Sequence, residues 1–218
     1  MMALAEKPVP SKFKRIEHKQ RKRRDGSATR EGFFQPLLQT MMQRRNKEDG
    51  QGIFIFVGPS GGVGVSYLVQ LLARELAEET NCRVLTGPPS LMDEDPLGLD
   101  GGGTPQSYIE RLPNVWSLVS SDEMENLPEV QLENVWIDLG PQDFDFLLID
   151  CSPLNESGDA LRLSQEADGV FLVVDAGKTR RDQIQYAQKL FAQTGRSLQG
   201  LILNRRTYPI PEFLYKLL

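Results

Sequence analysis

The fold is decided by residues Ile53–Leu76, which read I-F-I-F-V-G-P-S-G-G-V-G-V-S-Y-L-V-Q-L-L-A-R-E-L. Five consecutive apolar residues, Ile53–Val57, predict a buried strand of a parallel sheet. A glycine-dense turn, Gly58–Gly64, follows this strand. The next residues predict a helix, because apolar side chains recur at helical spacing on one face: Val65, Leu68, Val69, Leu72, Ala73, Leu76 and Ala77. A strand, a glycine loop and a helix in this order are the context of a phosphate-binding loop.

The glycine loop has the backbone for binding phosphate but lacks a lysine. Glycines allow consecutive backbone N–H groups to turn toward an anion, and the helix N-terminus adds partial positive charge. The stretch S-G-G-V-G-V-S, residues 60–66, resembles the K-G-G-x-G-K-[ST] loop of the septum-site and chromosome-partition ATPases. Ser60 and Val65 replace the two lysines of that loop, and no lysine occurs between Glu48 and Cys82. Loss of such a preorganised charge typically costs roughly 10²–10³ in rate.

A second apolar strand supplies the acidic residue of a nucleotide site. Residues 144–150 read F-D-F-L-L-I-D and end in Asp150. In phosphate-loop NTPases such a strand lies beside the phosphate loop, and its last aspartate sits near Mg²⁺. We therefore expect Ser66 and Asp150 to hold Mg²⁺, with Asp150 as the candidate catalytic residue. The loop residues expected to contact ATP or ADP are Gly61, Gly62, Val63, Gly64, Val65, Ser66 and Tyr67.

Charge is distributed unevenly along the 218-residue chain. Residues 1–24 contain nine Lys and Arg against two Glu, a balance of +7; the whole chain carries −5, so the remainder carries −12. We expect a disordered basic arm over residues 1–30 and one domain over residues 31–218. The arm is either a solubilising tail or a binder of anionic membrane lipids or nucleic acid through residues 12–24. No aromatic residue lies within Arg21–Arg24 to stack on bases, which disfavours nucleic acid.

Hydropathy sets the expected location of the protein. No apolar run approaches the ~20 residues that span a bilayer, and no apolar stretch follows the N-terminal charges as in a secretory signal. We therefore expect a cytoplasmic protein, with a peripheral position at the inner membrane as an option. Cys82 and Cys151 lack metal-ligand spacing and predict buried thiols, and the single histidine, His18, lies in the basic arm. A Cys/His metal site is therefore not expected.

Strand and helix patterns alternate through the rest of the chain. Residues 130–139 fit either a helix or an irregular connection, and the Gly- and Pro-rich residues 87–104 predict a long loop. This alternation predicts an α/β fold with a doubly wound, mainly parallel sheet between two layers of helices, as in P-loop NTPases. Further strands are expected at residues 82–86, 115–120, 169–174 and 198–204, and helices at 31–45, 105–112, 155–167 and 178–194.

Two C-terminal segments resemble the cytoplasmic domains of the bacterial tyrosine kinases (BY-kinases), which belong to the same ATPase superfamily. Residues 167–184, A-D-G-V-F-L-V-V-D-A-G-K-T-R-R-D-Q-I, are similar to their D-G-V-h-L-V-V-x-A-G-x-T segment, where h is a hydrophobic residue. Residues 198–205, L-Q-G-L-I-L-N-R, are similar to their closing strand. The resemblance runs from about Glu31 to the end. It implies Mg-ATP as the cofactor, Asn204 as an adenine contact, and a membrane copolymerase of capsular or extracellular polysaccharide as the partner.

Three further departures from the kinases accompany the missing loop lysine. Residues 84–89, V-L-T-G-P-P, stand where the kinases place an aspartate that binds metal and activates the attacking hydroxyl. Only Tyr208 and Tyr215 stand in place of a tyrosine-rich tail. Phe and Leu follow Glu31 at the places of the two arginines in the E-x-x-R-x-x-R motif of ring assembly. Together, the four losses predict a pseudo-enzyme.

Three functions stay open at this point. The leading hypothesis is a kinase-like accessory protein of polysaccharide biosynthesis and export, which works through a membrane copolymerase or an active kinase homologue. The second is an active tyrosine autokinase or ATPase whose charge comes from Arg74, Arg180, Arg181 or a neighbouring subunit of an oligomer. The third is a partition-type ATPase that binds DNA non-specifically through residues 12–24.

Overall fold

The computed structural model describes residues 34–45, 50–92, 107–119, 135–136 and 141–205. Several sequence predictions concern residues outside this set: the basic arm (1–30), most of the long loop (93–104), Glu31, Tyr208 and Tyr215. No helix in the described part of the chain is long and apolar enough to cross a membrane.

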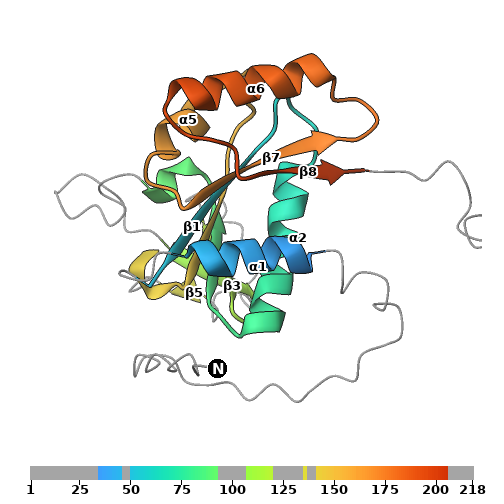
Figure 1. The fold of residues 1–218 in the computed structure, drawn as a ribbon. Helices are drawn as coiled ribbons and strands as arrows, with labels where there is room; N and C mark the ends of the chain where they lie inside the picture. Colours follow the sequence, from blue (N-terminus) through green and yellow to red (C-terminus); the bar gives the residue numbers. More distant parts are fainter. Residues whose placement is uncertain (1–33, 46–49, 93–106, 120–134, 137–140, 206–218) are drawn as a thin grey trace, which may run out of the picture. The chain divides into compact units, whose positions relative to one another are not determined.

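An eight-stranded sheet with the order β5-β3-β4-β2-β6-β1-β7-β8 forms the centre of the fold (Figure 1). Strand β1 lies between β6 and β7 and pairs with both in parallel, so its apolar run has a neighbour on each side. Strand β3 runs antiparallel to its neighbours β4 and β5. The predicted mainly parallel α/β sheet is thus confirmed. The strands are β1 (Gly52–Val57), β2 (Val84–Gly87), β3 (Ser107–Leu112), β4 (Val115–Val119), β5 (Val135–Trp136), β6 (Phe146–Asp150), β7 (Gly169–Asp175) and β8 (Gly200–Asn204).

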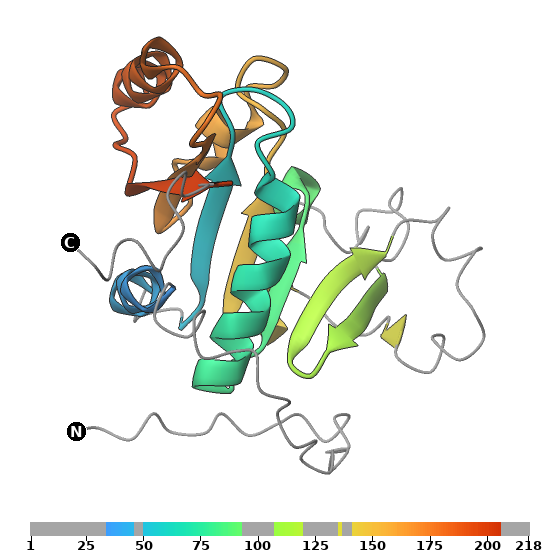
Figure 2. The same ribbon diagram turned by 90° about the vertical axis from the view of Figure 1, so that its right-hand side faces the viewer.

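Helices cover both faces of the sheet (Figures 1 and 2). Helices α1 (Gln35–Arg44) and α2 (Val65–Thr80) pack on one face, and α5 (Asp159–Leu163) and α6 (Arg181–Gln193) lie on the other. The apolar face predicted for α2 is the buried one, from Leu68 to Ala77. Beneath it the ring of Phe54 lies 6.3 Å from that of Phe146 and 6.2 Å from that of Phe171, so the three rings form a row across three neighbouring strands. This aromatic row ties the strands that carry the candidate site. Two short 3₁₀ turns, Pro89–Met92 and Pro141–Asp143, complete the described elements.

The helix predicted over residues 105–112 is wrong, because its described part forms strand β3. The hairpin of β3 and β4 closes through Pro113–Asn114, where Asn114 takes the left-handed φ of 63°. Tyr108 and Ile109, both residues that favour strands, are buried by this pairing. Val135–Trp136 pairs with β3 as a third strand, where the sequence indicated a helix or an irregular connection.

The two C-terminal helices are shorter than predicted. Only α5 is helical within residues 155–167, because the chain before it makes a turn in which the N–H of Leu154 donates to the carbonyl of Gly58 at 2.9 Å. The contact brings this turn against the phosphate loop. Helix α6 begins at Arg181 instead of residue 178, since the N–H of Thr179 donates to the carbonyl of Asp175 and closes a turn there.

Candidate functional site

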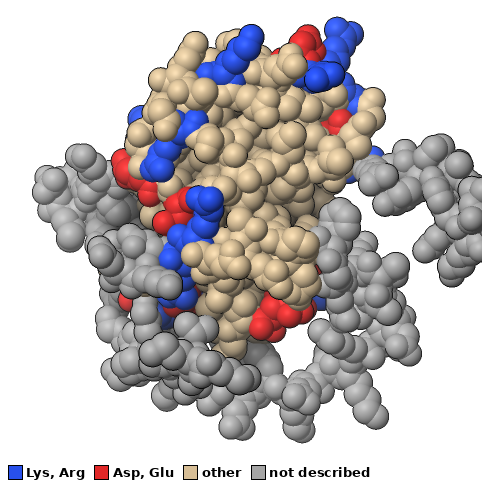
Figure 3. All heavy atoms as spheres, in the orientation of Figure 1, with Lys and Arg blue, Asp and Glu red and all other residues tan. Residues whose placement is uncertain are grey.

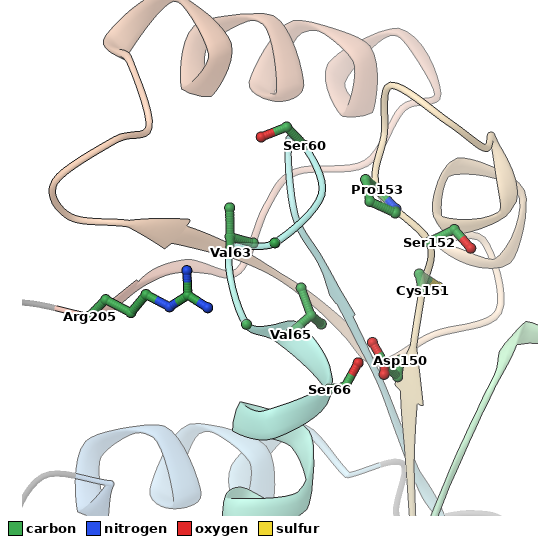
Figure 4. A pocket seen from close by; sticks show the side chains of 11 residues that line it. Ser60, Val63, Val65, Ser66, Asp150, Cys151, Ser152, Pro153 and Arg205 are labelled. Atoms are coloured by element: carbon green, nitrogen blue, oxygen red, sulfur yellow. The ribbon is translucent and has the colours of Figure 1, made fainter.

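The predicted phosphate loop lies between β1 and α2, at the carboxyl ends of the parallel strands (Figure 4). Gly62 and Gly64 have φ angles of 75° and 89°, in the left-handed region that strains any residue with a side chain. Between them Val63 is 5% exposed and packs into the core. Helix α2 begins at Val65, so its first N–H groups have no intrahelical partner and are available to an anion.

The side chain of Asn204 fastens the loop to the end of β8. Its Nδ2 donates to the carbonyl of Val63 at 2.8 Å and lies 3.5 Å from that of Gly64. A Cβ added to Gly64 would lie 2.5 Å from this Nδ2, so the close approach requires glycine. The resemblance implied an adenine contact for Asn204. In the structure its amide group holds the loop, and the adenine contact stays a prediction.

A cavity of about 360 Å³ opens beside the loop. Figure 4 shows Ser66 and Asp150 pointing toward each other at one side and Arg205 reaching in from the other. Of the predicted contact residues, Gly61 and Tyr67 are not among the described residues that line the cavity, and Tyr67 is 64% exposed. The described lining consists of Ser60, Gly62, Val63, Gly64, Val65, Ser66, Asp150, Cys151, Ser152, Pro153 and Arg205.

Ser66 and Asp150 form the predicted hydroxyl–carboxylate pair. Burial raises the pKa of Asp150, and the hydrogen bond that Ser66 donates to its carboxylate opposes this shift. A hydroxyl and a carboxylate are oxygen ligands of the kind that Mg²⁺ takes, usually with water and substrate phosphates completing the shell. The two residues therefore fit a magnesium ion, which would neutralise phosphate charge when bound.

Positive charge reaches the cavity from Arg205 and not from the arginines that the sequence indicated. Val65, at the lysine position, is uncharged and packs partly against the core. Arg74 lies on the exposed face of α2 and pairs with Glu78 at 2.9 Å, and Arg180 and Arg181 lie at the start of α6. Among the described lining residues, Arg205 is the one cation. In the sequence, the signal that could have pointed to Arg205 was its position directly after Asn204.

A second cavity, of about 450 Å³, lies on the other side of Asp150. It opens at the end of β2, where the kinases place an aspartate and this chain has Gly87 and Pro88. Its polar lining comes from Gln70, Thr86, Arg111 and Ser117. Asp150 is thus the one carboxylate between the two cavities among the residues that the structure describes.

Comparison with known proteins gives relatives in sequence and in fold. No protein-family model matches the chain. A stretch of 92 residues is 29% identical to the tyrosine-protein kinase CpsD of Streptococcus agalactiae, and it spans 40% of this chain and 40% of that relative. A 62-residue stretch is 34% identical to CpsD of Streptococcus pneumoniae serotype 4, over 28% of this chain and 27% of that protein.

Solved structures agree on the fold. The chimerical protein CapA2B2 superposes with a TM-score of 0.55 at 18% identity, over 80% of this chain and 84% of that chain. The BceF tyrosine kinase domain gives 0.54 at 22%, over 78% and 73%. The MinD cell division protein of Aquifex aeolicus gives 0.52 at 18%, over 76% and 72%. The chain therefore has the BY-kinase-like P-loop ATPase fold that its sequence predicts.

Proposed function

We propose that the chain is a BY-kinase-like accessory protein of capsular or extracellular polysaccharide production, which binds Mg-nucleotide weakly and transfers its phosphoryl group poorly or not at all. One observation carries the proposal: an uncharged Val65 stands at the start of α2 in a cavity that is otherwise assembled. The glycine loop, the hydrogen-bonded Ser66–Asp150 pair and the loop-holding Asn204 support nucleotide binding at this cavity.

The loop lysine and the carboxylate at the end of β2 matter more for phosphoryl transfer than for binding of the nucleotide in its ground state. Negative charge spreads over the transferred group in the transition state, where lysine and Mg²⁺ stabilise it. Backbone N–H groups and Mg²⁺ can still hold a bound phosphate, but the missing ammonium lowers the rate by roughly 10²–10³. Among the described residues, the end of β2 also offers no carboxylate to activate an attacking hydroxyl, since Thr86, Gly87 and Pro88 stand there.

An accessory role requires the fold and its surfaces but does not require phosphoryl transfer. The resemblance of residues 167–184 and 198–205 to the kinase domains supports a membrane copolymerase or an active kinase homologue as the partner. The basic residues 12–24 support adhesion to an anionic membrane surface. On the face shown in Figure 3, acidic and basic side chains of the described residues are interspersed, and these residues form no extended basic surface for DNA there.

Calorimetric titration of Mg-ATP and Mg-ADP into the wild type and Val65→Lys tests the proposal. The proposal expects weak binding by the wild type and binding tightened roughly 10–100-fold by the new ammonium–phosphate contact. Arg74→Gln, which alters an exposed surface pair, serves as the control and should match the wild type. Wild-type binding as tight as in Val65→Lys, accompanied by autophosphorylation, would overturn the proposal in favour of an active kinase.

The arm has its own test. Sedimentation with phosphatidylserine-containing vesicles should fall when residues 1–30 are deleted and should weaken with added salt. Retention on DNA at low salt, with none on vesicles, would instead support the partition-type alternative.

A further inference from the structure

Arg205 is held at the edge of the phosphate cavity by its own backbone. It follows β8 directly and takes a left-handed φ of 54°, and its N–H donates to Oδ1 of Asn204 at 2.9 Å. Asn204 thus fixes the loop through its Nδ2 and the start of Arg205 through its Oδ1. The conformation turns the arginine side chain toward the glycine loop (Figure 4).

The guanidinium is oriented by one partner and keeps donors for another. Nη1 lies 3.4 Å from Oδ2 of Asp175, a carboxylate whose side chain is 6% exposed. The N–H of Gly177, which donates to Oδ1 of Asp175, and the ion pair with Arg205 lower the pKa of this carboxyl, so Asp175 stays ionised. Within the described residues, Nε and Nη2 of Arg205 have no hydrogen-bond partner. Nε lies 3.9 Å from the Cβ position of Gly64, which places this edge against the loop.

We infer that Arg205 replaces the missing loop lysine as the cation that binds the phosphate chain of a nucleoside di- or triphosphate. This inference rests on the proposed function in one respect, namely that the cavity takes a nucleotide. A guanidinium offers a planar pair of donors that fits two phosphate oxygens. Arg205 and the Ser66–Asp150 pair face the cavity from opposite sides, so a phosphate between them would meet a cation on one side and Mg²⁺ on the other.

The use of Arg205 in place of the loop lysine also explains how nucleotide binding and phosphoryl transfer can separate. A lysine at position 65 would approach the phosphate from the helix N-terminus, whereas Arg205 approaches from the end of β8 and is tethered by Asp175. A cation that contacts the phosphate chain equally in the ground state and in the transition state tightens binding without speeding transfer. The arrangement therefore favours a protein that holds a nucleotide as a structural ligand.

Arg205→Gln and Arg205→Lys test the inference, with Arg74→Gln as the matched control for loss of one arginine. Each is titrated by calorimetry with Mg-ADP, Mg-ATP, tripolyphosphate and adenosine. Removing a charged hydrogen-bond donor should weaken the three phosphate compounds roughly 10–100-fold and leave adenosine unchanged. Arg205→Lys should lose less than Arg205→Gln, and adding Val65→Lys to Arg205→Gln should restore phosphate binding. Melting temperatures near that of the wild type show that the variants are folded.

Each of the following results would overturn the inference. They are wild-type protein that binds none of the phosphate compounds, an Arg205→Gln variant that binds them as Arg74→Gln does, and an equal loss for adenosine. An effect on tripolyphosphate alone, without any on the nucleotides, would reassign Arg205 to a polyphosphate site and so contradict it as well. Wild-type autophosphorylation, measured in parallel, would overturn the proposed function and leave the role of Arg205 standing.

Discussion

Substituting Gly64 by alanine should destabilise the protein more than the same change at Gly62, because only Gly64 touches the asparagine that holds the loop. Both glycines have left-handed φ angles, of 89° and 75°. A Cβ at position 64 would lie 2.5 Å from Nδ2 of Asn204, whereas one at position 62 would meet nothing within 4 Å. The pair therefore separates backbone strain from the loss of a specific contact.

The expected magnitudes follow from these contacts. A left-handed residue with a Cβ costs about 1–2 kcal/mol, which applies to both variants. Gly64→Ala must also displace Asn204 and break its 2.8 Å bond to the carbonyl of Val63, a loss of about 1 kcal/mol. We therefore expect a free energy of unfolding lower by about 1–2 kcal/mol for Gly62→Ala and by about 2–3 kcal/mol for Gly64→Ala.

Urea unfolding followed by tryptophan fluorescence measures both values, since Trp116 is buried in the sheet. A double-mutant cycle sharpens the assay: in an Asn204→Ala background, the cost of Gly64→Ala should fall to that of Gly62→Ala. Equal losses for the two glycine variants in the wild-type background would refute the role of Asn204. So would an unchanged cost of Gly64→Ala once Asn204 is removed.

Three further predictions concern single buried or half-buried groups. Asp150→Asn should raise the melting temperature of the metal-free protein at pH 7, because burial raises the pKa of Asp150. This gain in melting temperature should fade as the pH drops through that pKa and should vanish below about pH 4. A gain that does not change with pH would contradict the prediction. Burial also raises the pKa of the Cys151 thiol to about 12 and that of Cys82 above its usual value. Neither thiol should therefore react with a thiol reagent at pH 8 until urea unfolds the protein, and rapid labelling of the native protein would argue against this burial. Asp145→Ala should lower the free energy of unfolding by roughly 2–4 kcal/mol, since Asp145 accepts from Arg45 at 3.0 Å and from the N–H of Arg83 at 2.9 Å. As the control, Glu166→Ala at an exposed position should change the free energy of unfolding by under about 0.5 kcal/mol. Equal losses of stability in the two variants would count against the ion pair.

The sequence predicted best where local pattern and tertiary packing agree. The run from Ile53 to Leu76 carries a buried strand, a glycine turn and one apolar helix face, and each appears in the structure as predicted. Strand β3 was missed because six residues reading S-Y-I-E-R-L give no clear period, and pairing with β4 decides their conformation. The prediction of one helix over residues 155–167 was too long. The turn before α5 depends on the hydrogen bond from the N–H of Leu154 to the carbonyl of Gly58, which joins segments far apart in sequence.

The candidate site residues also fall into two groups, those that follow from local pattern and those that depend on tertiary contacts. Val65, Ser66 and Asp150 could be identified because each lies at a fixed offset in a strand–loop–helix or strand-end pattern. The structure adds the bond from Asn204 to the loop and the position of Arg205 at the cavity, which depend on contacts with a loop about 140 residues earlier in the chain. Such long-range contacts leave no periodic trace in one sequence.

We propose that this cavity holds Mg-nucleotide and transfers its phosphoryl group poorly or not at all. This proposal is tested most directly by incubating the protein with γ-labelled Mg-ATP, at a concentration that calorimetry shows to be saturating, and measuring label on protein and in released phosphate. We expect the wild type to show no more transfer than Asp150→Asn, which lacks the carboxylate of the magnesium pair. Labelled tyrosine or released phosphate that accumulates in the wild type and not in Asp150→Asn would contradict it.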